Sequence, residues 1–492
     1  MYKKLFSLIL ICLLTTANLA IAGEVSAVDK KQAKTDELNS IGNKIITSEY
    51  PDADKISPQI EDIKKVNDTK VIEGSVEKTI DITLEDCIKF ALGNNPKIRA
   101  AIEEISASDA RIKQSWSNYF PNLNWTTNGA KTRNLLFSDA IGARDATYTL
   151  YYLGQISVSQ MIYDFGVTQN QVTIKKLAYK SAQETLTSVV NEVIKQTKDA
   201  YYSLLLAYDD KKVKEDNVQK FELFYNQARA YYEIGTNPKV DVTIAEVNLS
   251  NAKLQLIQAD NQINVAMANL NNVMGLPYMT KFNVQERLKY ADCDITLEDA
   301  MSIADESRPD LKVAKLQVEQ ARQQLKLMKK QYLPKITAQG NYAIGGSQPT
   351  KSYGYSFGGY LDFPTVNGML INQQIKEAKA NYSKQMANAT STENDIRLEI
   401  QKAYLTLVEK KNQIPVAFLG MKQAKENYDI SFGRYKVGEA SPTEMKDAQV
   451  SYLNSQISYY NALYQFNSAK AGLEKAIGKN IMFGEEVVDL TP

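Results

Sequence analysis

Apolar residues recur at alternating spacings of three and four in two stretches of the chain. The first series is Val242, Ala245, Leu249, Ala252, Leu256, Ala259, Ile263, Ala266, Leu270 and Val273, and the second is Met445, Ala448, Tyr452, Ser455, Tyr459, Ala462, Phe466, Ala469, Leu473 and Ala476. This alternation is typical of a coiled-coil seam, and the frequent Ala and Ser allow helix backbones to approach closely. An ordinary amphipathic helix in a soluble bundle also explains the stripe. It does not explain two aligned copies of such length interrupted by strand-like segments.

The period of the pattern changes to two in the middle of each half of the chain. Polar and apolar residues alternate in Gln155–Met161 and in Tyr353–Phe357, as they do in β-strands. Glycine, serine and aspartate separate each segment from a second candidate strand. We therefore predict strands at about 123–132, 148–162, 335–344 and 352–361. About ten residues is the length that a tilted membrane-spanning strand needs.

A helical period returns after each pair of strands and continues for about 70 residues. The two runs cover about 167–234 and 367–437, and at ~1.5 Å per residue each would reach ~100 Å. Pro415 lies inside the second run, so we expect it to interrupt and kink that helix. Shorter helices are predicted upstream of the strands, with starts near Thr83, Pro96, Thr296 and Pro309.

These signals occur twice because the chain contains an internal duplication. The letters of Ile82–Asp86 return as Ile295–Asp299, 213 positions later. Further along the offset falls to 203, and it pairs Tyr232 with Tyr435, Gly235 with Gly438 and Gly275 with Gly478. Matches in register over such distances predict two copies of one structural unit. The predicted parts are repeat 1 at 80–276, a linker at 277–294, repeat 2 at 295–481 and a C-terminal tail at 482–492.

The first 22 residues have the composition of a secretory signal peptide. Lys3 and Lys4 precede the apolar run Leu5–Leu14, and Ala20–Ala22 supplies small residues for cleavage. Residues 23–79 are polar and rich in Lys, Asp and Glu, so we expect an extended or poorly ordered arm. The sequence gives this arm no function.

Composition limits the chemistry that the chain could perform. It contains no histidine, which excludes Ser/His and Cys/His nucleophilic arrangements and His-ligated metal sites. Neither a glycine-rich phosphate loop nor a cysteine cluster stands out, so no enzyme, metal or cofactor is predicted. The formal net charge of +1 gives no support for nucleic-acid binding. Cys87 and Cys293 could pair in an oxidising compartment or could remain separate buried thiols.

Four strands per chain make a poor isolated sheet, because each of the two edge strands has backbone groups without a partner strand. In lipid, unpaired backbone groups cost several kcal/mol each, so strands must close into a barrel. Three chains would supply twelve strands, an even number that membrane barrels allow. Together with the signal peptide, this predicts a mainly α protein whose trimeric 12-stranded transmembrane β-barrel is continuous with a periplasmic α-helical tunnel.

Over roughly residues 82–481 the chain resembles the TolC-type outer-membrane efflux proteins. The resemblance rests on the duplicated Thr-Leu-Glu-Asp start, the Asn95–Pro96 and Arg308–Pro309 steps, the Tyr-X-Pro junctions and the two Tyr-X-X-Gly turns. It implies a homotrimer in the outer membrane of a Gram-negative-type envelope, with the helices in the periplasm. It also implies a passive exit duct that works with a periplasmic adaptor (membrane fusion) protein and an inner-membrane RND or ABC transporter.

The resemblance places a periplasmic gate around the second turn. Tyr435 matches the family's gate tyrosine, and Glu444 and Asp447 match two ring aspartates. Asp241 matches an acidic gate position after the first turn. Ala440 stands where a well-known member has a gate arginine, so that arginine's salt bridge is not expected here. Three copies of Glu444 and Asp447 would put six carboxylates around a narrow mouth, which would favour cations.

Ordinary turn chemistry explains the same residues more simply. Ser441, Pro442 and Glu444 fit an N-cap, a first helical position and a capping box. Asp447 would then be a solvated charge near a helix N-terminus. The resemblance also implies that the adaptor docks at the two tips, formed by Ile234, Gly235, Val437 and Gly438. Closing the helices with left-handed glycines is compatible with that docking.

Two classes of function therefore remain. The first is an outer-membrane exit duct of a tripartite efflux pump or a type I secretion system. The alternative is a periplasmic coiled-coil adaptor or structural scaffold without a pore. The strand pairs favour the duct, because an adaptor needs no hairpins of membrane-spanning length. Drugs, metal ions and polypeptides all remain possible substrates, since the inner-membrane partner largely selects them.

Overall fold

The computed structural model describes residues 82–134, 147–236, 238–284, 287–290, 295–346, 352–363 and 368–479. The predicted signal peptide at 1–22, the arm at 23–79 and the tail at 482–492 lie outside these ranges. Among the described helices, none combines the length and the apolar character that crossing a membrane requires.

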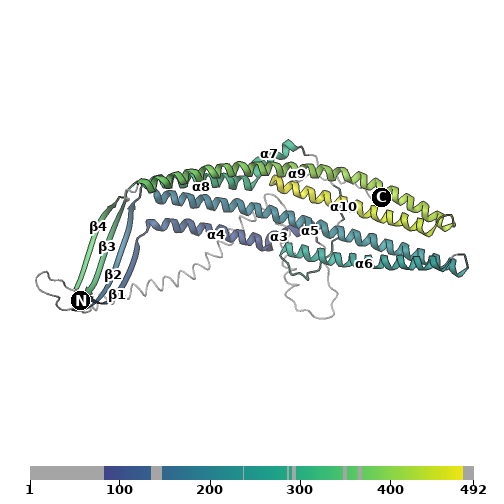
Figure 1. Ribbon diagram of the computed structural model, residues 1–492, viewed down its shortest axis with the longest axis horizontal. Coiled ribbons are helices and arrows are strands. Elements are labelled where there is room, and N and C mark those ends of the chain that lie inside the picture. The colour runs from purple at the N-terminus through teal and green to yellow at the C-terminus, as the bar shows by residue number, and fades with distance from the viewer. Residues whose placement is uncertain are drawn as a thin grey trace. The chain divides into compact units, whose positions relative to one another are not determined.

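The same order of elements occurs twice along the chain, as the duplication predicts (Figure 1). The first set is α3 (Leu84–Asn94), α4 (Pro96–Trp116), the 3-10 turn η2 (Ser117–Tyr119), β1 (Asn122–Asn134), β2 (Thr147–Tyr163), α5 (Val167–Glu233) and α6 (Lys239–Met274). The second set is α7 (Leu297–Ser307), α8 (Pro309–Lys330), β3 (Lys335–Gly346), β4 (Ser352–Asp362), α9 (Gly368–Lys436) and α10 (Pro442–Ile477).

Local capping chemistry sets the starts of the shorter helices. The Thr83 hydroxyl accepts the backbone N–H of Asp86, and the Asp86 carboxylate accepts the N–H of Thr83 in return. Thr296 accepts the N–H of Asp299 in the matching position of repeat 2. These bonds satisfy helix N–H groups that have no partner within the helix.

The four strands form one antiparallel sheet in the order β1-β2-β3-β4. The expected ranges 123–132, 148–162, 335–344 and 352–361 fall within β1, β2, β3 and β4 respectively. Pairing between β2 and β3, from Tyr152 opposite Gly346 to Tyr163 opposite Ile336, joins the two repeats. β1 and β4 are the sheet's edge strands and pair on one side only within the chain.

The two long helices have 67 residues in α5 and 69 in α9. The predicted interruption at Pro415 is wrong, because α9 continues through this residue. A proline removes one N–H donor and crowds the carbonyl four residues earlier. The helix on both sides retains its own hydrogen bonds, and the neighbouring Ile414 is only 1% exposed. Packing thus offsets the local cost.

The predicted seam is confirmed as the buried face of the return helices. In α6 the buried members are Ala245, Leu249, Ala252, Ala259, Ile263, Ala266 and Leu270, and in α10 they are Met445, Ala448, Tyr452, Tyr459, Ala462, Phe466, Leu473 and Ala476. Along these faces α6 packs on α5, whereas α10 packs on both α9 and α5. The strands and the α5–α6 and α9–α10 turns therefore lie at opposite ends of the long helices (Figure 1).

Candidate functional site

The two helical turns have the same backbone geometry. Gly235 and Gly438 both have φ of 80°, the left-handed conformation that glycine adopts without strain. Each turn is closed by an N–H five residues after its acceptor, from Thr236 to Tyr231 and from Glu439 to Arg434, at 2.9 Å. Beside the glycines, Ile234 is 73% exposed and Val437 is 71% exposed. Each tip thus presents one apolar side chain to solvent.

The second turn contains an ion pair that the sequence analysis missed. The Ser441 hydroxyl caps α10 by accepting the Glu444 N–H at 3.1 Å, as predicted. The Glu444 carboxylate, expected to complete the capping box, instead accepts Nη1 of Arg434 at 2.6 Å. Arg434 also donates to the Glu439 carbonyl at 3.3 Å. Arg434 and Glu444 are ten positions apart and lie on different helices, so no helical spacing predicts their contact. Only the folded hairpin shows this pair.

Tyr435 is the most enclosed of the predicted gate residues, at 3% exposed. Its ring packs on Phe224 of α5, with centroids 5.2 Å apart. The buried hydroxyl has no hydrogen-bond partner among the described residues. Burial raises the pKa of Tyr435 to about 12, and the nearby charge of Asp241 adds to the shift. Tyr435 therefore stays neutral at physiological pH.

The two ring carboxylates lie one turn apart on α10. Asp447 is 67% exposed at its side chain, and Lys446 Nζ lies 3.8 Å from it. Glu444, also exposed, is paired with Arg434. Tyr435 lies buried on α9 and Asp241 lies in the first turn of α6, while Glu444 and Asp447 face solvent on α10.

Polar and cation–π contacts connect α5 to the α9–α10 hairpin above the tips. The Tyr231 hydroxyl donates to the Lys436 carbonyl at 3.1 Å. Higher up, Lys220 Nζ lies 5.0 Å from the ring centre of Tyr428 and 4.5 Å from that of Tyr452. These contacts fix the second hairpin against the first.

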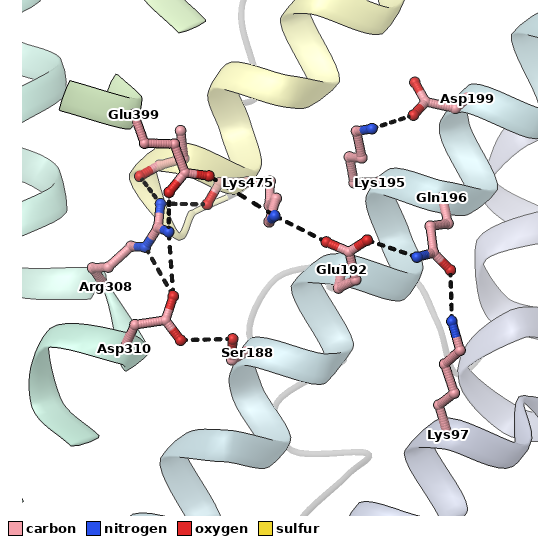
Figure 2. A network of polar contacts seen from close by, with 11 residues as sticks. Lys97, Ser188, Glu192, Lys195, Gln196, Asp199, Arg308, Asp310, Glu399 and Lys475 are labelled. Carbon is pink, nitrogen blue, oxygen red and sulfur yellow. Dashed lines mark hydrogen bonds and ion pairs between the residues drawn. The ribbon is translucent and has the colours of Figure 1, made fainter. Parts of the chain in front are cut away.

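A second polar cluster lies at the other end of α10, and Figure 2 shows its members. Arg308, at the start of α8, binds Asp310 and also Glu399 of α9. Lys475 of α10 lies between Glu399, at 3.8 Å, and Glu192 of α5, at 3.0 Å. Four helices from both repeats are thereby joined by ion pairs.

Nothing in the described part of the chain forms a group of three metal-binding side chains. Cys87 is buried in α3, whereas Cys293 lies outside the described residues.

Comparison with known proteins agrees with this architecture. The family model described as "Outer membrane efflux protein" matches residues 87–276 and 300–479, which together are most of the chain. Nodulation protein T of Rhizobium leguminosarum bv. trifolii is 23% identical over 83% of this chain and 91% of its own length. The probable efflux pump outer membrane protein TtgC of Pseudomonas putida is 22% identical over 81% of this chain and 83% of its own length.

A solved structure has the same fold at low sequence identity. The CmeC outer membrane channel of Campylobacter jejuni superposes with a TM-score of 0.70 and 18% identity, covering 83% of this chain and 90% of that one. The expected resemblance to TolC-type efflux proteins is thus confirmed, and with it a family of channels rather than enzymes. The chain belongs to the outer membrane efflux protein family and is an outer-membrane channel protein.

Proposed function

We propose that three copies of the chain assemble into a passive exit duct that crosses the outer membrane and extends through the periplasm. The observation that carries this proposal is the placement of a four-stranded sheet at the end of helices of about 70 residues. Its two unpaired edge strands would pair with neighbouring copies, so that three sheets close into twelve strands. Helices of this length would extend the barrel by ~100 Å.

Exposed apolar stripes on the helices support assembly. On α6, Val240, Ile244, Val247, Leu254, Ile257 and Val265 are 38–65% exposed, and on α9, Leu398, Leu405, Val408, Val416, Leu419 and Ile430 are 37–72% exposed. Their spacings are three, four or sums of three and four, so each helix carries a second seam beside its buried one. Stripes of this extent are typical of interaction surfaces. In the trimer, neighbouring copies would cover them.

The gate of the proposed duct lies at the helical tips. Tyr435, packed on Phe224 of α5, would hold the two hairpins of one chain together. Asp241 would lie at the first tip, while Glu444 and Asp447 from three chains would surround the mouth. Within one chain Arg434 pairs with Glu444 at 2.6 Å and Lys446 lies 3.8 Å from Asp447, so each ring carboxylate has a cation beside it. The tips formed by Ile234, Gly235, Val437 and Gly438 would dock a periplasmic adaptor through their exposed apolar side chains.

The adaptor would in turn connect the duct to an inner-membrane transporter of the RND or ABC class. Efflux pumps and type I secretion systems both fit this arrangement, and the transporter would select the substrate. The alternative, a periplasmic scaffold without a pore, would leave the sheet edges and the second seams unexplained.

Fractionation and conductance measurements test the duct. We expect an outer-membrane trimer that dissociates on heating in detergent and forms channels in planar bilayers. A monomer in the periplasmic extract would contradict the proposal. For the gate, the double variant Glu444→Ala/Asp447→Ala is expected to lose block by divalent cations. Unchanged conductance and unchanged block would remove the carboxylate ring from the proposal.

A further inference from the structure

We propose that Arg308 is a positioning residue for the gate, because it anchors the far end of α10 and so fixes where the second tip lies. This inference rests on the proposed duct. It assigns a role to the α7–α8 junction of repeat 2, whose Arg308–Pro309 step is part of the family resemblance.

Arg308 first acts on the backbone at the end of α10. The last carbonyls of a helix have no intrahelical partner and carry partial negative charge. Nη1 of Arg308 donates to the Ala476 carbonyl at 2.5 Å and to the Lys475 carbonyl at 3.4 Å. The neighbouring Ser307 hydroxyl donates to the Ile477 carbonyl at 2.7 Å. The α7–α8 junction thus caps the end of α10.

Arg308 is also part of a continuous charge network (Figure 2). The arginine side chain is 6% exposed, and its charge is balanced by Asp310 on its own helix and Glu399 on α9. Through Glu399 the network reaches Lys475, and through Lys475 it reaches Glu192 on α5. The end of α10 is therefore fixed simultaneously to three other helices.

Repeat 1 uses a neutral version of the same junction. Asn95 occupies the position equivalent to Arg308, and its side-chain amide donates to the Val273 carbonyl at 2.7 Å. Val273 is equivalent to Ala476, so the same backbone carbonyl is capped in both repeats. The capping residue is charged only in the second junction, whereas in the first Lys97 of α4 reaches the network through Gln196 of α5, at 3.2 Å. The asymmetry singles out the hairpin that bears Glu444 and Asp447.

Geometry explains why an anchor at this distance would control the mouth. α10 has 36 residues, so at ~1.5 Å per residue it is ~54 Å long. A tilt of about 5° about one end of a helix of this length moves the other end by ~5 Å. That displacement exceeds the length of a hydrogen bond. Loosening the Arg308 anchor would therefore let the second tip leave its closed position.

The test is the single-channel conductance of purified trimers at about 0.1 M and about 1 M KCl, each divided by the conductivity of the solution. Arg308→Asn copies the repeat 1 junction and keeps a neutral cap, while Arg308→Ala removes both cap and charge. We expect both to raise the resting conductance several-fold at low salt. We expect the difference from wild type to shrink at high salt, where the wild-type network is screened. Asn95→Ala is the matched control and should conduct like wild type.

Glu399→Gln provides a second route, because it weakens the charge network while leaving Arg308 to cap α10. If Arg308→Ala does not assemble, Glu399→Gln still tests the inference, because it should raise the conductance at low salt. Intact trimers of Arg308→Asn and Glu399→Gln with wild-type conductance at both salt concentrations would overturn the inference, even if they melt at a lower temperature. A wild-type chain that forms no conducting trimer would overturn the duct itself, and the inference with it.

Discussion

The α5–α6 and α9–α10 hairpins descend from one duplicated unit, yet they are fastened differently. Their turns share φ of 80° at Gly235 and Gly438. Around that common backbone, Tyr231 of the first hairpin is replaced by Arg434 of the second, which binds Glu444. α6 packs on α5, whereas α10 packs on α9 and also on α5. The two turns share their backbone geometry, while the polar side chains around them differ.

The largest expected effect on stability compares Gly275 with Gly235. Both have the left-handed backbone conformation, but their neighbouring atoms differ. Gly275 ends α6 with φ of 71°, and a Cβ there would lie 2.6 Å from the Asn94 carbonyl oxygen. Gly275→Ala should lower the free energy of unfolding by about 3 kcal/mol or more, because backbone strain and a backbone clash add. Thermal unfolding of the purified protein measures this change.

Gly235→Ala is the control for that variant. Gly235 has φ of 80°, but among the described residues no atom lies within 4 Å of the place that a Cβ would take. Only the left-handed strain of about 1 kcal/mol should therefore remain. Equal losses in the two variants would show that the close approach to Asn94 does not constrain α6.

The second expected effect on stability concerns Asp209, a buried carboxylate of repeat 1 whose equivalent residue in repeat 2 is uncharged. Asp209 on α5 is 8% exposed, and burial raises its pKa from 3.8 to about 6 despite nearby Arg287 and Lys212. The equivalent residue of α9 is Asn412, which is exposed. Because the folded pKa is raised, the ionised carboxylate destabilises the fold above pH 6, and this cost disappears below about pH 4.

Asp209→Asn, which copies repeat 2, should therefore raise the free energy of unfolding at neutral pH by about 1–3 kcal/mol. Unfolding measured between pH 4 and pH 8 checks both the gain and its loss at acidic pH. A gain that did not change with pH would refute the titration of Asp209 as its cause.

The smallest expected effect on stability concerns the Arg434–Glu444 pair. Its side chains are 47% and 43% exposed, so Arg434→Ala should cost no more than about 1 kcal/mol. Arg434→Ala should change the conductance clearly, because each of three copies would gain an unpaired carboxylate at the mouth. Arg229→Ala is the matched control, since the Arg229–Glu233 pair at 2.9 Å lies within one helix near the first tip. Equal cation block in the two variants would contradict the role of Arg434.

Periodic patterns predicted most of the fold. The seams, the strand pairs and the two long helices follow from local spacing, and the capping threonines Thr83 and Thr296 follow from helix chemistry. Pro415 was misjudged because the sequence shows its lost hydrogen bond but not the packing around Ile414. Arg434 and the Arg308 network were missed because their partners are brought together by tertiary folding. The family resemblance singled out Tyr435 and Asp241 as gate residues, which stays a prediction, and only the fold shows that Tyr435 is buried.

The pairing of β2 with β3 also constrains the order in which the chain can fold. Ser159 lies opposite Gln339, so 180 residues separate these strand partners. At the usual synthesis rate of roughly 5–20 residues per second, β3 is made about 10–35 seconds after β2. During that interval the β1–β2 hairpin exposes an unpaired edge that other strands can join. The four-stranded sheet can therefore be completed only after repeat 2 has been synthesised.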